Sequence, residues 1–481
     1  MHKKNGGNPS VFFAPFRAKN TDASRLALKK HKIRVITHYL FFHYLISRIF
    51  YVILQKIWLR QTKMKKYQLF IAAAAMLFSL MPSAASAQGT TSPYSKFGYG
   101  MLGDNATSTQ RAMGGVGYAM RNGRQVNTMN PASYSATDSL TFLFDMGLDL
   151  NNMWAKEDDK RAYSLGGGLD YVSIQVPLSK TVGASIGLMP YSSMGYSYTT
   201  TLDNGYELRT GKGGLNQLYL GAGWRPFKNF SIGFNLSYLF GTFAYNTVGV
   251  LTSNTYFYRE MKVRDYNLQF GAQYTVDISR DRHVTLGAVY SPKKYLHGTT
   301  MATKYDTEQD AVIDTIGSMN LNKNYNTPHS IGVGLSYGHD NHFLVEADFT
   351  YQMWKDTQYP TIQSKDGEYI EEPTQFNNRY RIGVGMEYTP NFRGNYAQRI
   401  KFRVGAWYNS DYLTAKGNKL GDYGVGLGFG LPTSSSKTII NFGVEYRHRN
   451  SSPVKLITED YVNVTVGVTF NEMWFWKSKI R

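Results

Sequence analysis

Nine charged residues lie in stretches where apolar and polar residues alternate, and their side chains have the clearest capacity for chemistry in this sequence. Two neighbouring carboxylates can act as a general acid and a general base. Because acidic and basic residues are mixed here, a salt-bridge network between facing segments is the simpler interpretation. No carboxylate pair stands out, so we expect no enzyme activity. The nine residues are Asp145, Asp149, Glu346, Asp348, Arg381, Glu387, Arg403, Glu445 and Arg447.

Histidine and glycine motifs give no second reactive centre. The sequence His-Asp-Asn-His at 339–342 contains metal-ligand residue types, but its place between two alternating stretches is typical of a tight turn. Three glycines at 166–168 lie inside an alternating stretch, so they indicate a bend and not a phosphate-binding loop. The absence of cysteine excludes disulfides, iron–sulfur clusters and a thiol nucleophile. We therefore expect no metal and no cofactor.

The elements that position these residues have the period of β-strands. In the stretch 461–470, four valines and Phe470 occupy alternate positions, and the residues between them are mostly polar or small. A period of two places alternate side chains on opposite faces of a sheet. The mean hydropathy is negative, which argues against a bundle of apolar membrane helices. Aromatic residues make up 15% of the chain, as suits a membrane barrel with aromatic girdles.

The alternating stretches predict an all-β fold, a transmembrane antiparallel β-barrel of about 14 strands. Fourteen is an even number, as single-chain bacterial barrels require. The expected strands are 139–151, 163–178, 181–200, 214–226, 229–251, 256–278, 282–305, 328–338, 342–354, 377–390, 400–413, 423–433, 438–448 and 461–470. The expected long extracellular connections are 152–162, 201–213, 306–327, 355–376 and 449–460. The expected short periplasmic turns are 179–180, 227–228, 279–281, 339–341 and 434–437, and the connection 391–399 is longer than its periplasmic place predicts.

The N-terminus has the composition of a targeting segment. Residues 1–87 contain 15 of the 53 Lys and Arg residues and one of the 34 acidic residues, which leaves a net charge of +5 elsewhere. The overall charge of +19 therefore does not indicate a nucleic-acid partner. A lysine pair, an apolar run and an Ala-Ser-Ala site form a signal peptide over 64–87. We interpret 1–63 as a mis-assigned upstream extension.

The last two predicted regions are the barrel itself, 139–470, and a periplasmic C-terminal tail, 471–481. The final strand ends on Phe470, as outer-membrane strands often do at their assembly signal. This ending implies the barrel-assembly machinery as a partner during biogenesis. The tail holds Trp474 and Trp476, which suit the inner bilayer interface or the periplasmic rim. A frayed terminus is the alternative.

Residues 88–138 do not alternate, and they are rich in glycine and small residues. They are too polar to span a bilayer. A barrel of about fourteen strands has a wide lumen, which is either filled by a plug or left to water. The segment therefore predicts an N-terminal hatch, or plug, in the lumen.

Two motifs of this hatch resemble one known family. Arg-Ala-Met-Gly-Gly-Val-Gly-Tyr-Ala at 111–119, followed by Asn130, Pro131 and Ala132, resembles the FadL-type outer-membrane transporters of long-chain fatty acids and aromatic hydrocarbons. The resemblance covers about 88–470 and implies a fourteen-stranded barrel whose hatch motif is this Asn-Pro-Ala. Residues 121–124 depart from the family, since they are bulkier and more basic than its usual small, acidic stretch.

The resemblance also implies a lateral exit at a kinked third strand. Pro190 in the expected third strand removes a ladder donor and is nearly excluded from central strands, so it indicates a bulge or gap. A strand that ends at Pro190 is the alternative. We assign the lateral-opening kink to Pro190 and Gly195. The apolar hatch residues expected to bind ligand are Met113, Val116, Tyr118 and Met120.

The first hypothesis for function is a channel in the bacterial outer membrane for passive uptake of hydrophobic small molecules, fatty-acid-like or aromatic. Its partners would be the hydrophobic ligand and outer-membrane lipid, and its oligomeric state stays open. The alternative is an accessory barrel in protein secretion or surface assembly, with 306–327 and 355–376 as partner-binding loops. The hatch argues against a plain porin. A continuous apolar tunnel would favour transport, and a sealed lumen would favour the partner role.

Overall fold

The computed structural model describes residues 11–12, 90–202, 205–250, 254–306, 311–320, 325–340, 342–365, 368–433 and 438–473. These residues belong to one compact unit. The expected signal peptide lies outside the described residues, as does nearly all of the expected upstream extension. Residues 474–481 of the expected tail also lie outside them.

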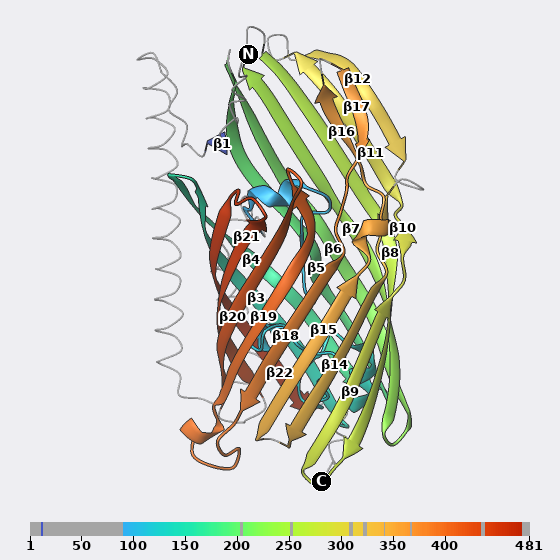
Figure 1. Cartoon of the computed structure of the whole chain (residues 1–481). Helices are drawn as coiled ribbons and strands as arrows, with labels where there is room; N and C mark the ends of the chain where they lie inside the picture. The colour runs from blue at the N-terminus through green and yellow to red at the C-terminus, as the bar shows by residue number, and fades with distance from the viewer. Residues whose placement is uncertain are drawn as a thin grey trace, which may run out of the picture. The chain divides into compact units, whose positions relative to one another are not determined.

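Within the described ranges, fourteen long antiparallel strands form the wall of a barrel (Figure 1). The last strand closes the barrel on the first, with Thr458 opposite Lys156 and Met473 opposite Thr141. The fold class and strand number predicted from the alternation are thereby confirmed. The wall strands are β3 (Thr141–Glu157), β4 (Lys160–Pro177), β5 (Val182–Leu202), β6 (Gly205–Phe227), β7 (Phe230–Val250), β8 (Asn254–Asp277), β9 (Arg282–Ser291), β14 (Ser330–His339), β15 (Phe343–Gln352), β18 (Arg379–Tyr388), β19 (Lys401–Ala415), β20 (Asn418–Pro432), β21 (Ile439–Ser452) and β22 (Thr458–Met473).

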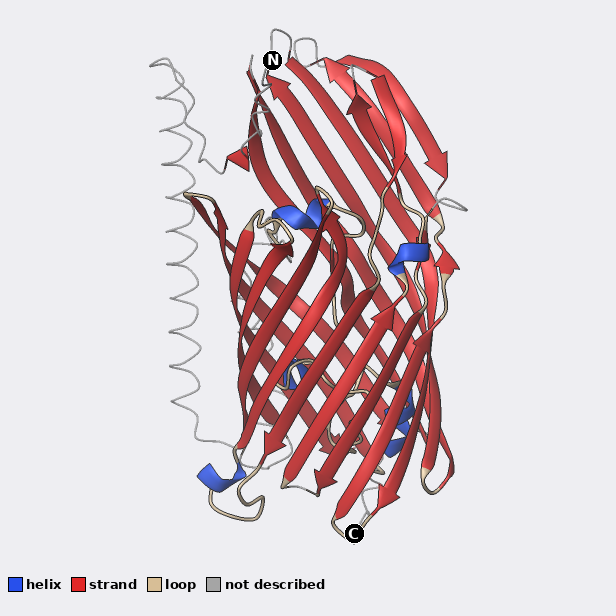
Figure 2. Cartoon of the chain, in the orientation of Figure 1, coloured by secondary structure: helices blue, strands red, loops and turns tan. Residues whose placement is uncertain are grey.

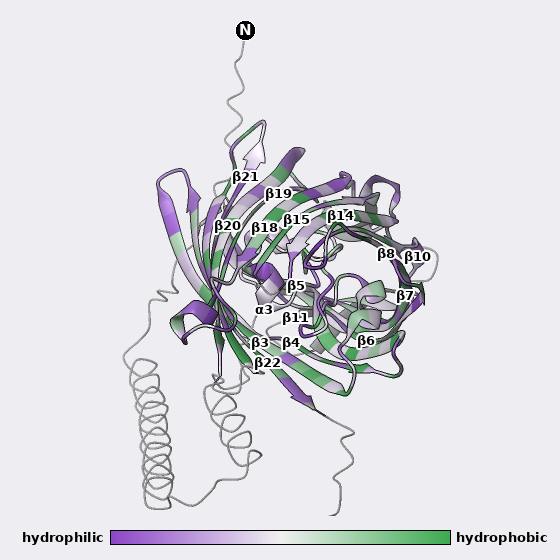
Figure 3. Cartoon of the chain, turned by 90° about the horizontal axis from the view of Figure 1, so that it is seen from below, coloured by the Kyte–Doolittle hydropathy of each residue, from purple (hydrophilic) through white to green (hydrophobic). Residues whose placement is uncertain are grey.

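The remaining elements are short, and Figure 2 shows how little of the described part of the chain is helical. Four of them, η1, β2, α3 and η2, belong to residues 90–138, which we call the interior segment. In Figure 3, α3 lies within the ring of wall strands. The short elements are β1 (Val11–Phe12), η1 (Pro93–Lys96), β2 (Met101–Leu102), α3 (Ser108–Arg111), η2 (Pro131–Ala136), β10 (Lys294–Tyr295), β11 (Gly298–Asp306), β12 (Ala311–Asn320), β13 (Asn326–Thr327), η3 (Trp354–Asp356), β16 (Pro360–Lys365), β17 (Glu368–Pro373) and η4 (Ala397–Arg399).

The alternation sorts side chains between an apolar outer face and a packed interior. In β20, Tyr423, Val425, Leu427 and Phe429 are half exposed, and the glycines between them are buried. An apolar face that is exposed on a barrel with a filled interior is the face that meets lipid. Among the described residues, no helix has the length and apolarity needed to cross a membrane.

Two rows of aromatic residues bound this apolar band. At one level, Tyr238 pairs with Tyr266 across β7 and β8, and Tyr408 pairs with Tyr423 across β19 and β20. At the other level, Phe402 packs edge-on against Phe429, with ring centroids 5.8 Å apart. Such rows mark the two bilayer interfaces of outer-membrane barrels. Strands β5 to β8 continue for many residues beyond the first row, which Figure 1 shows as the tall green part of the wall.

Three connections expected to be long are largely strand. Strands β3 and β4 meet at a turn of Asp158 and Asp159, and only residues 203–204 separate β5 from β6. Strand β21 runs to Ser452, so the connection before β22 shrinks to residues 453–457. The expectation was wrong because we interpreted polar residues on both faces as a sign of a loop. A strand that continues above the bilayer meets water on its outer face, so it can be polar on both faces.

The expected strand 282–305 is divided. Strand β9 ends at Ser291, and Pro292 follows it, where a missing N–H cannot continue the ladder. The chain resumes at Gly298 as β11, which pairs with the upper part of β8. The expected connections 306–327 and 355–376 contain further strands, β12 in the first and the β16–β17 hairpin in the second.

Candidate functional site

The Asn-Pro-Ala motif fastens the interior segment to the wall. Asn130 caps η2, since its Oδ1 accepts from the N–H of Ala132 at 3.1 Å. Its Nδ2 donates to the carbonyl oxygen of Tyr118 at 2.7 Å and to that of Ala272 in β8 at 3.2 Å. Pro131 is the first residue of η2, where a missing N–H costs nothing. Asn130 therefore caps η2 and at the same time joins η2 to Tyr118 of the interior segment and to β8 of the wall.

Glycines in the wall let this motif approach the backbone. Gly233 in β7 and Gly271 in β8 face Pro131, and a Cβ on either would overlap Asn130, Pro131 or Ala132. Glycine is common in strands where another backbone approaches closely. Reasoning from the sequence missed these residues, although glycine at inward positions of neighbouring strands was a usable signal.

Two carboxylates of β15 bind the backbone of the glycine-rich motif. Asp348 Oδ2 accepts from the N–H groups of Gly117 and Tyr118 at 2.7 and 3.0 Å. Glu346 Oε1 accepts from those of Ala119 and Met120 at 2.7 and 3.1 Å. Both carboxylates are buried. One oxygen of each carboxylate thus accepts two backbone hydrogen bonds from the interior segment, which anchors that segment to β15.

Two arginines of β18 complete this anchor. Arg381 donates to the carbonyl oxygens of Gly114 and Gly115 at 2.9 and 3.0 Å. Arg379 pairs with Asp104 at 3.0 Å, and Arg381 lies 3.5 Å from the same carboxylate. Burial alone would raise the pKa of Asp104, but the charges of Arg381 and Arg379 outweigh it and lower that pKa to about 2. Asp104 is therefore an anion at any physiological pH.

Residues 121–124, which depart from the family pattern, also form side-chain contacts. Arg121 donates to Gln273 in β8 and to Ser135 in η2, each at 3.2 Å. Arg124 pairs with Asp138 at 3.2 Å, with both side chains at least half exposed. Burial, aided by Arg225, lowers the pKa of Arg121 to about 10. Arg121 thus ties the end of the interior segment to the wall, whereas Arg124 forms an ion pair within the segment.

The four residues expected to bind ligand are packed in place. Met113, Val116 and Met120 are fully buried and form one cluster with Leu344 of the wall. Tyr118 packs with Met129 and Val289, and its hydroxyl lies 3.0 Å from Thr350 Oγ1. Tyr118 also lines a polar cavity of about 90 Å³.

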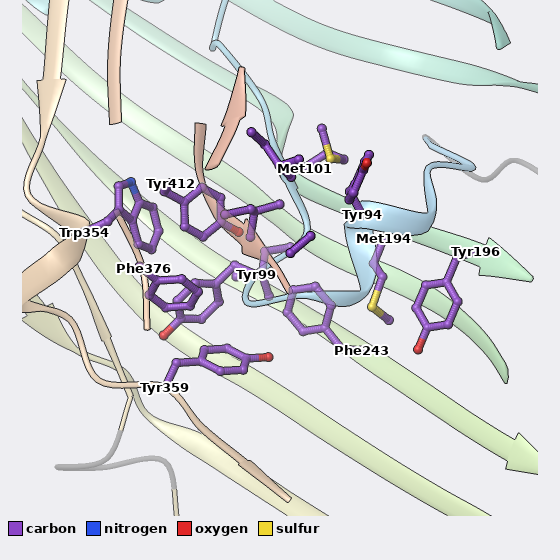
Figure 4. Packing of buried hydrophobic residues seen from close by; sticks show 14 of the residues in the cluster. Tyr94, Tyr99, Met101, Met194, Tyr196, Phe243, Trp354, Tyr359, Phe376 and Tyr412 are labelled. Carbon is purple, nitrogen blue, oxygen red and sulfur yellow. The ribbon is translucent and has the colours of Figure 1, made fainter. Parts of the chain in front are cut away.

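An aromatic cluster brings together residues of the interior segment, of the wall and of the connection between β15 and β18 (Figure 4). Trp354 stacks on Tyr412 with ring centroids 4.2 Å apart, and Tyr99 of the interior segment meets Tyr359 edge-on at 4.8 Å. Tyr99, Trp354, Tyr359 and Tyr412 are all buried. Residues from the interior segment and from distant loops thus pack together at this end of the barrel.

The wall itself has a gap. Strand β5 pairs with β4 only from Gly183 to Leu188, opposite Val172 to Pro177. Pro190 lies at a register shift between β5 and β6, where Tyr191 is the extra residue. Such a bulge bends the strand. Beyond it, β5 follows β6 and β4 follows β3, so the two strands no longer pair.

The interior segment occupies part of the free edge of β5. Met101 and Leu102 form β2 and pair with Ser193 and Ser192. Ser95 Oγ donates to the carbonyl oxygen of Gly195 at 3.0 Å and lies 3.1 Å from its N–H. The second kink residue of the sequence prediction is therefore a contact point of the interior segment. Farther along this edge, β1 pairs with Thr199 and Thr200.

A cavity of about 420 Å³ lies at this gap. Ala162, Tyr163 and Ser164 line it from β4, and Tyr196 and Ser197 line it from β5. Met153 of β3 and Thr210, Gly211, Lys212 and Asn246 of the neighbouring strands complete the lining with Thr91. The lining combines apolar and hydroxyl side chains with one lysine and one asparagine, and it includes no carboxylate.

The other candidate reactive groups have structural partners. Glu387 pairs with Lys401 at 2.5 Å and with Arg403 at 2.7 Å, as the predicted salt-bridge network requires. His342 donates its N–H to the carbonyl oxygen of His339, so the His-Asp-Asn-His sequence forms the predicted turn. Across the described residues, no group of three or more His, Asp or Glu side chains is arranged to hold a metal ion.

These features define an outer-membrane β-barrel of the FadL type, and solved structures share the fold. The Pseudomonas putida toluene transporter TodX has a TM-score of 0.56 at 15% identity, covering 78% of this chain and 100% of its own. A Pseudomonas aeruginosa FadL homologue has a TM-score of 0.55 at 12% identity, with 77% and 99% covered. The Ralstonia pickettii toluene transporter TbuX has a TM-score of 0.53 at 16% identity, with 76% and 98% covered.

The family model named BamG matches residues 64–481, and the chain belongs to the BamG family. A comparison with curated proteins gives no match. The FadL-type resemblance expected from the motifs is confirmed in the fold, and the protein is located in the bacterial outer membrane.

Proposed function

We propose that this barrel is a channel that passes hydrophobic small molecules sideways between the bilayer and the gap separating β4 from β5. The observation that carries the proposal is the loss of β4–β5 pairing beyond Leu188 beside a cavity of about 420 Å³. Small-ligand sites have volumes of roughly 300–1,000 Å³ and mostly apolar linings. Transfer would run down a concentration gradient, with no cofactor.

The interior segment is the hatch of this proposal. The aromatic cluster closes the interior towards the extracellular loops, so a ligand entering there requires the interior segment to move. Asn130, Pro131 and Ala132 would hold the pivot, and Pro190 and Gly195 would keep the wall open. Met113, Val116, Tyr118 and Met120 would meet the ligand only after that movement. The toluene transporters among the fold neighbours support a hydrophobic ligand of this kind.

Filling the gap tests this function. Ser164→Trp places a large side chain in the cavity, and Ser279→Trp at an exposed periplasmic turn is the matched control. We expect the first variant to lower the initial uptake of radiolabelled toluene at least fivefold, with wild-type amounts of folded barrel. Uptake by both variants at the wild-type rate would overturn the proposal.

A second candidate is an accessory role in the assembly of other outer-membrane or surface proteins. Two observations favour it: the BamG family match over residues 64–481 and the close packing of the interior. A role of this kind needs a surface that binds partner proteins, and it does not need an open lumen. Depletion of the protein would then lower the amounts of other outer-membrane barrels. Expression of the Ser164→Trp variant in the depleted cells would restore these amounts as fully as expression of the wild type. A channel alone predicts normal barrel amounts after depletion.

A further inference from the structure

One connection at the periplasmic rim is much longer than its neighbours. Residues Thr389–Ile400 join β18 to β19, whereas the other described connections at this rim, 178–181, 228–229, 278–281 and 340–342, are short. Outer-membrane barrels keep their periplasmic turns short. Figure 1 shows this connection with η4 projecting at the lower rim of the barrel. We call it the periplasmic loop.

Hydrogen bonds inside the periplasmic loop hold it in one conformation. Asn391 and Gln398 close it, with the N–H of Asn391 donating to the carbonyl oxygen of Gln398 at 2.8 Å. The N–H of Gln398 donates to Asn395 Oδ1, and the N–H of Asn395 donates to Gln398 Oε1, each at 3.1 Å. This reciprocal pair links Asn395, which precedes η4, to Gln398 within η4, as the side chains of a capping box do. The loop is therefore preorganised, which lowers the entropy cost of binding.

The preorganised loop presents two aromatic residues and two arginines. Phe392 and Tyr396 are 45% and 51% exposed. The guanidinium of Arg393 lies 5.0 Å from the Phe392 ring, and that of Arg399 lies 5.8 Å from the Tyr396 ring. Arg393 is exposed and Arg399 is partly exposed. Aromatic residues and Arg are enriched at protein interfaces. From 389 to 400 the sequence has two basic residues and no acidic one.

Anchoring to lipid does not account for this loop. The wall already carries its lower aromatic row at Tyr388 and Phe402, the residues on either side of the loop in β18 and β19. Phe392 lies four residues beyond Tyr388, and Tyr396 lies six residues before Phe402. A membrane anchor at this level also requires no internal hydrogen-bond network.

We propose that the periplasmic loop is a docking site for a periplasmic protein with an acidic surface. Phe392 and Tyr396 supply the apolar contact, and Arg393 and Arg399 pair with carboxylates of that protein. The inference goes beyond the proposed function, because it concerns a different face of the barrel. It holds for a channel and for an accessory role alike.

The test has two stages and uses the full chain in its own membrane. A photoreactive benzoyl-phenylalanine replaces Tyr396, and the matched control carries it at Phe227, an exposed aromatic residue at another periplasmic strand end. We expect cross-linking to a periplasmic protein from position 396 and not from position 227. Cross-linking to lipid alone, or equally from both positions, overturns the proposal.

The second stage tests the chemistry. The cross-linked protein is purified, and its Kd for the full barrel in lipid nanodiscs is measured. The double variant R393E/R399E should weaken binding at least tenfold, F392A/Y396A should weaken it similarly, and R393K/R399K should change it less than threefold. If charge reversal prevents folding, R393Q/R399Q replaces it. A Kd unchanged by both the charge and the aromatic variants contradicts the proposal.

Discussion

The N–H of Gly103 donates to the carbonyl oxygen of Tyr191 at 2.9 Å. The interior segment is therefore hydrogen-bonded to the part of β5 that does not pair with β4. Tyr191 is the bulged residue of β5, next to Pro190. Met101 and Leu102 continue this pairing along the edge. The interior segment and the wall gap are therefore one mechanical unit, since a movement of residues 95–103 exposes the edge of β5.

Ser95→Ala should loosen this joint. The change removes the hydroxyl that donates to the carbonyl oxygen of Gly195 at 3.0 Å and meets its N–H at 3.1 Å. Leaving such buried groups without partners costs about 1–3 kcal/mol. We expect faster amide hydrogen exchange at Gly195, measured by mass spectrometry, with β20 unchanged. Equal exchange in Ser95→Ala and the wild type would show that Ser95 does not hold the edge.

Asn130→Ala and Asn130→Asp should separate the two functions of this side chain. Aspartate keeps the cap to Ala132 but loses the donor to Tyr118 and Ala272, whereas alanine loses both. Loss of a cap costs about 1 kcal/mol. Limited proteolysis of the interior segment should therefore be fastest for Asn130→Ala and intermediate for Asn130→Asp. Equal cleavage of both variants and the wild type would rule out an anchoring role.

Gly271→Ala should displace the Asn-Pro-Ala motif. Its Cβ would lie 2.8 Å from Pro131 Cδ, too close for carbon atoms. Overpacking of this kind costs about 1–3 kcal/mol. Gly421→Ala is the control, because the nearest atom to its Cβ lies 3.6 Å away. The thermal midpoint should fall for Gly271→Ala and stay within error for Gly421→Ala; equal midpoints would argue against close packing at Gly271.

Acid should release the anchor at Asp104. Because folding lowers the pKa of Asp104 from 3.8 to about 2, its ion pairs stabilise the fold fully above about pH 4. This stabilisation is lost as the pH falls from about 4 towards 2. Protection of residues 104–117 against exchange should decline over that window in the wild type. Asp104→Asn should be less protected already at pH 7 and should decline less; identical profiles would contradict this assignment.

The strands and their number could be predicted from the sequence because burial on one face imposes a period of two. Their upper ends could not, since polar residues such as Asp158 and Asp159 are exposed at the turn between β3 and β4, where water permits polarity on the outer face. The break at Pro292 was overlooked beside the strong alternation of the flanking residues. Pro190 was readable as a bulge because a central strand has no other place for proline.

The site was predictable only in part. The motif 130–132 and the carboxylates Glu346 and Asp348 were identified, since motifs and inward charges are visible in the chain. Their partners were not, because contacts such as those of Gly271 with Pro131 join residues far apart in sequence. The four apolar residues expected to bind ligand are buried in this structure, and their assignment to a ligand pocket stays a prediction.

The measurement that tests the central claim most directly is photolabelling of the wild-type barrel in nanodiscs with an aromatic diazirine. The account predicts labelling of Met153 and Tyr196 at the gap, competed by excess toluene and lost in Ser164→Trp. Lipid-facing Leu427 on β20 should be labelled from the bilayer and should not respond to Ser164→Trp. Labelling confined to lipid-facing residues such as Leu427, with none at Met153 or Tyr196, would contradict the lateral channel.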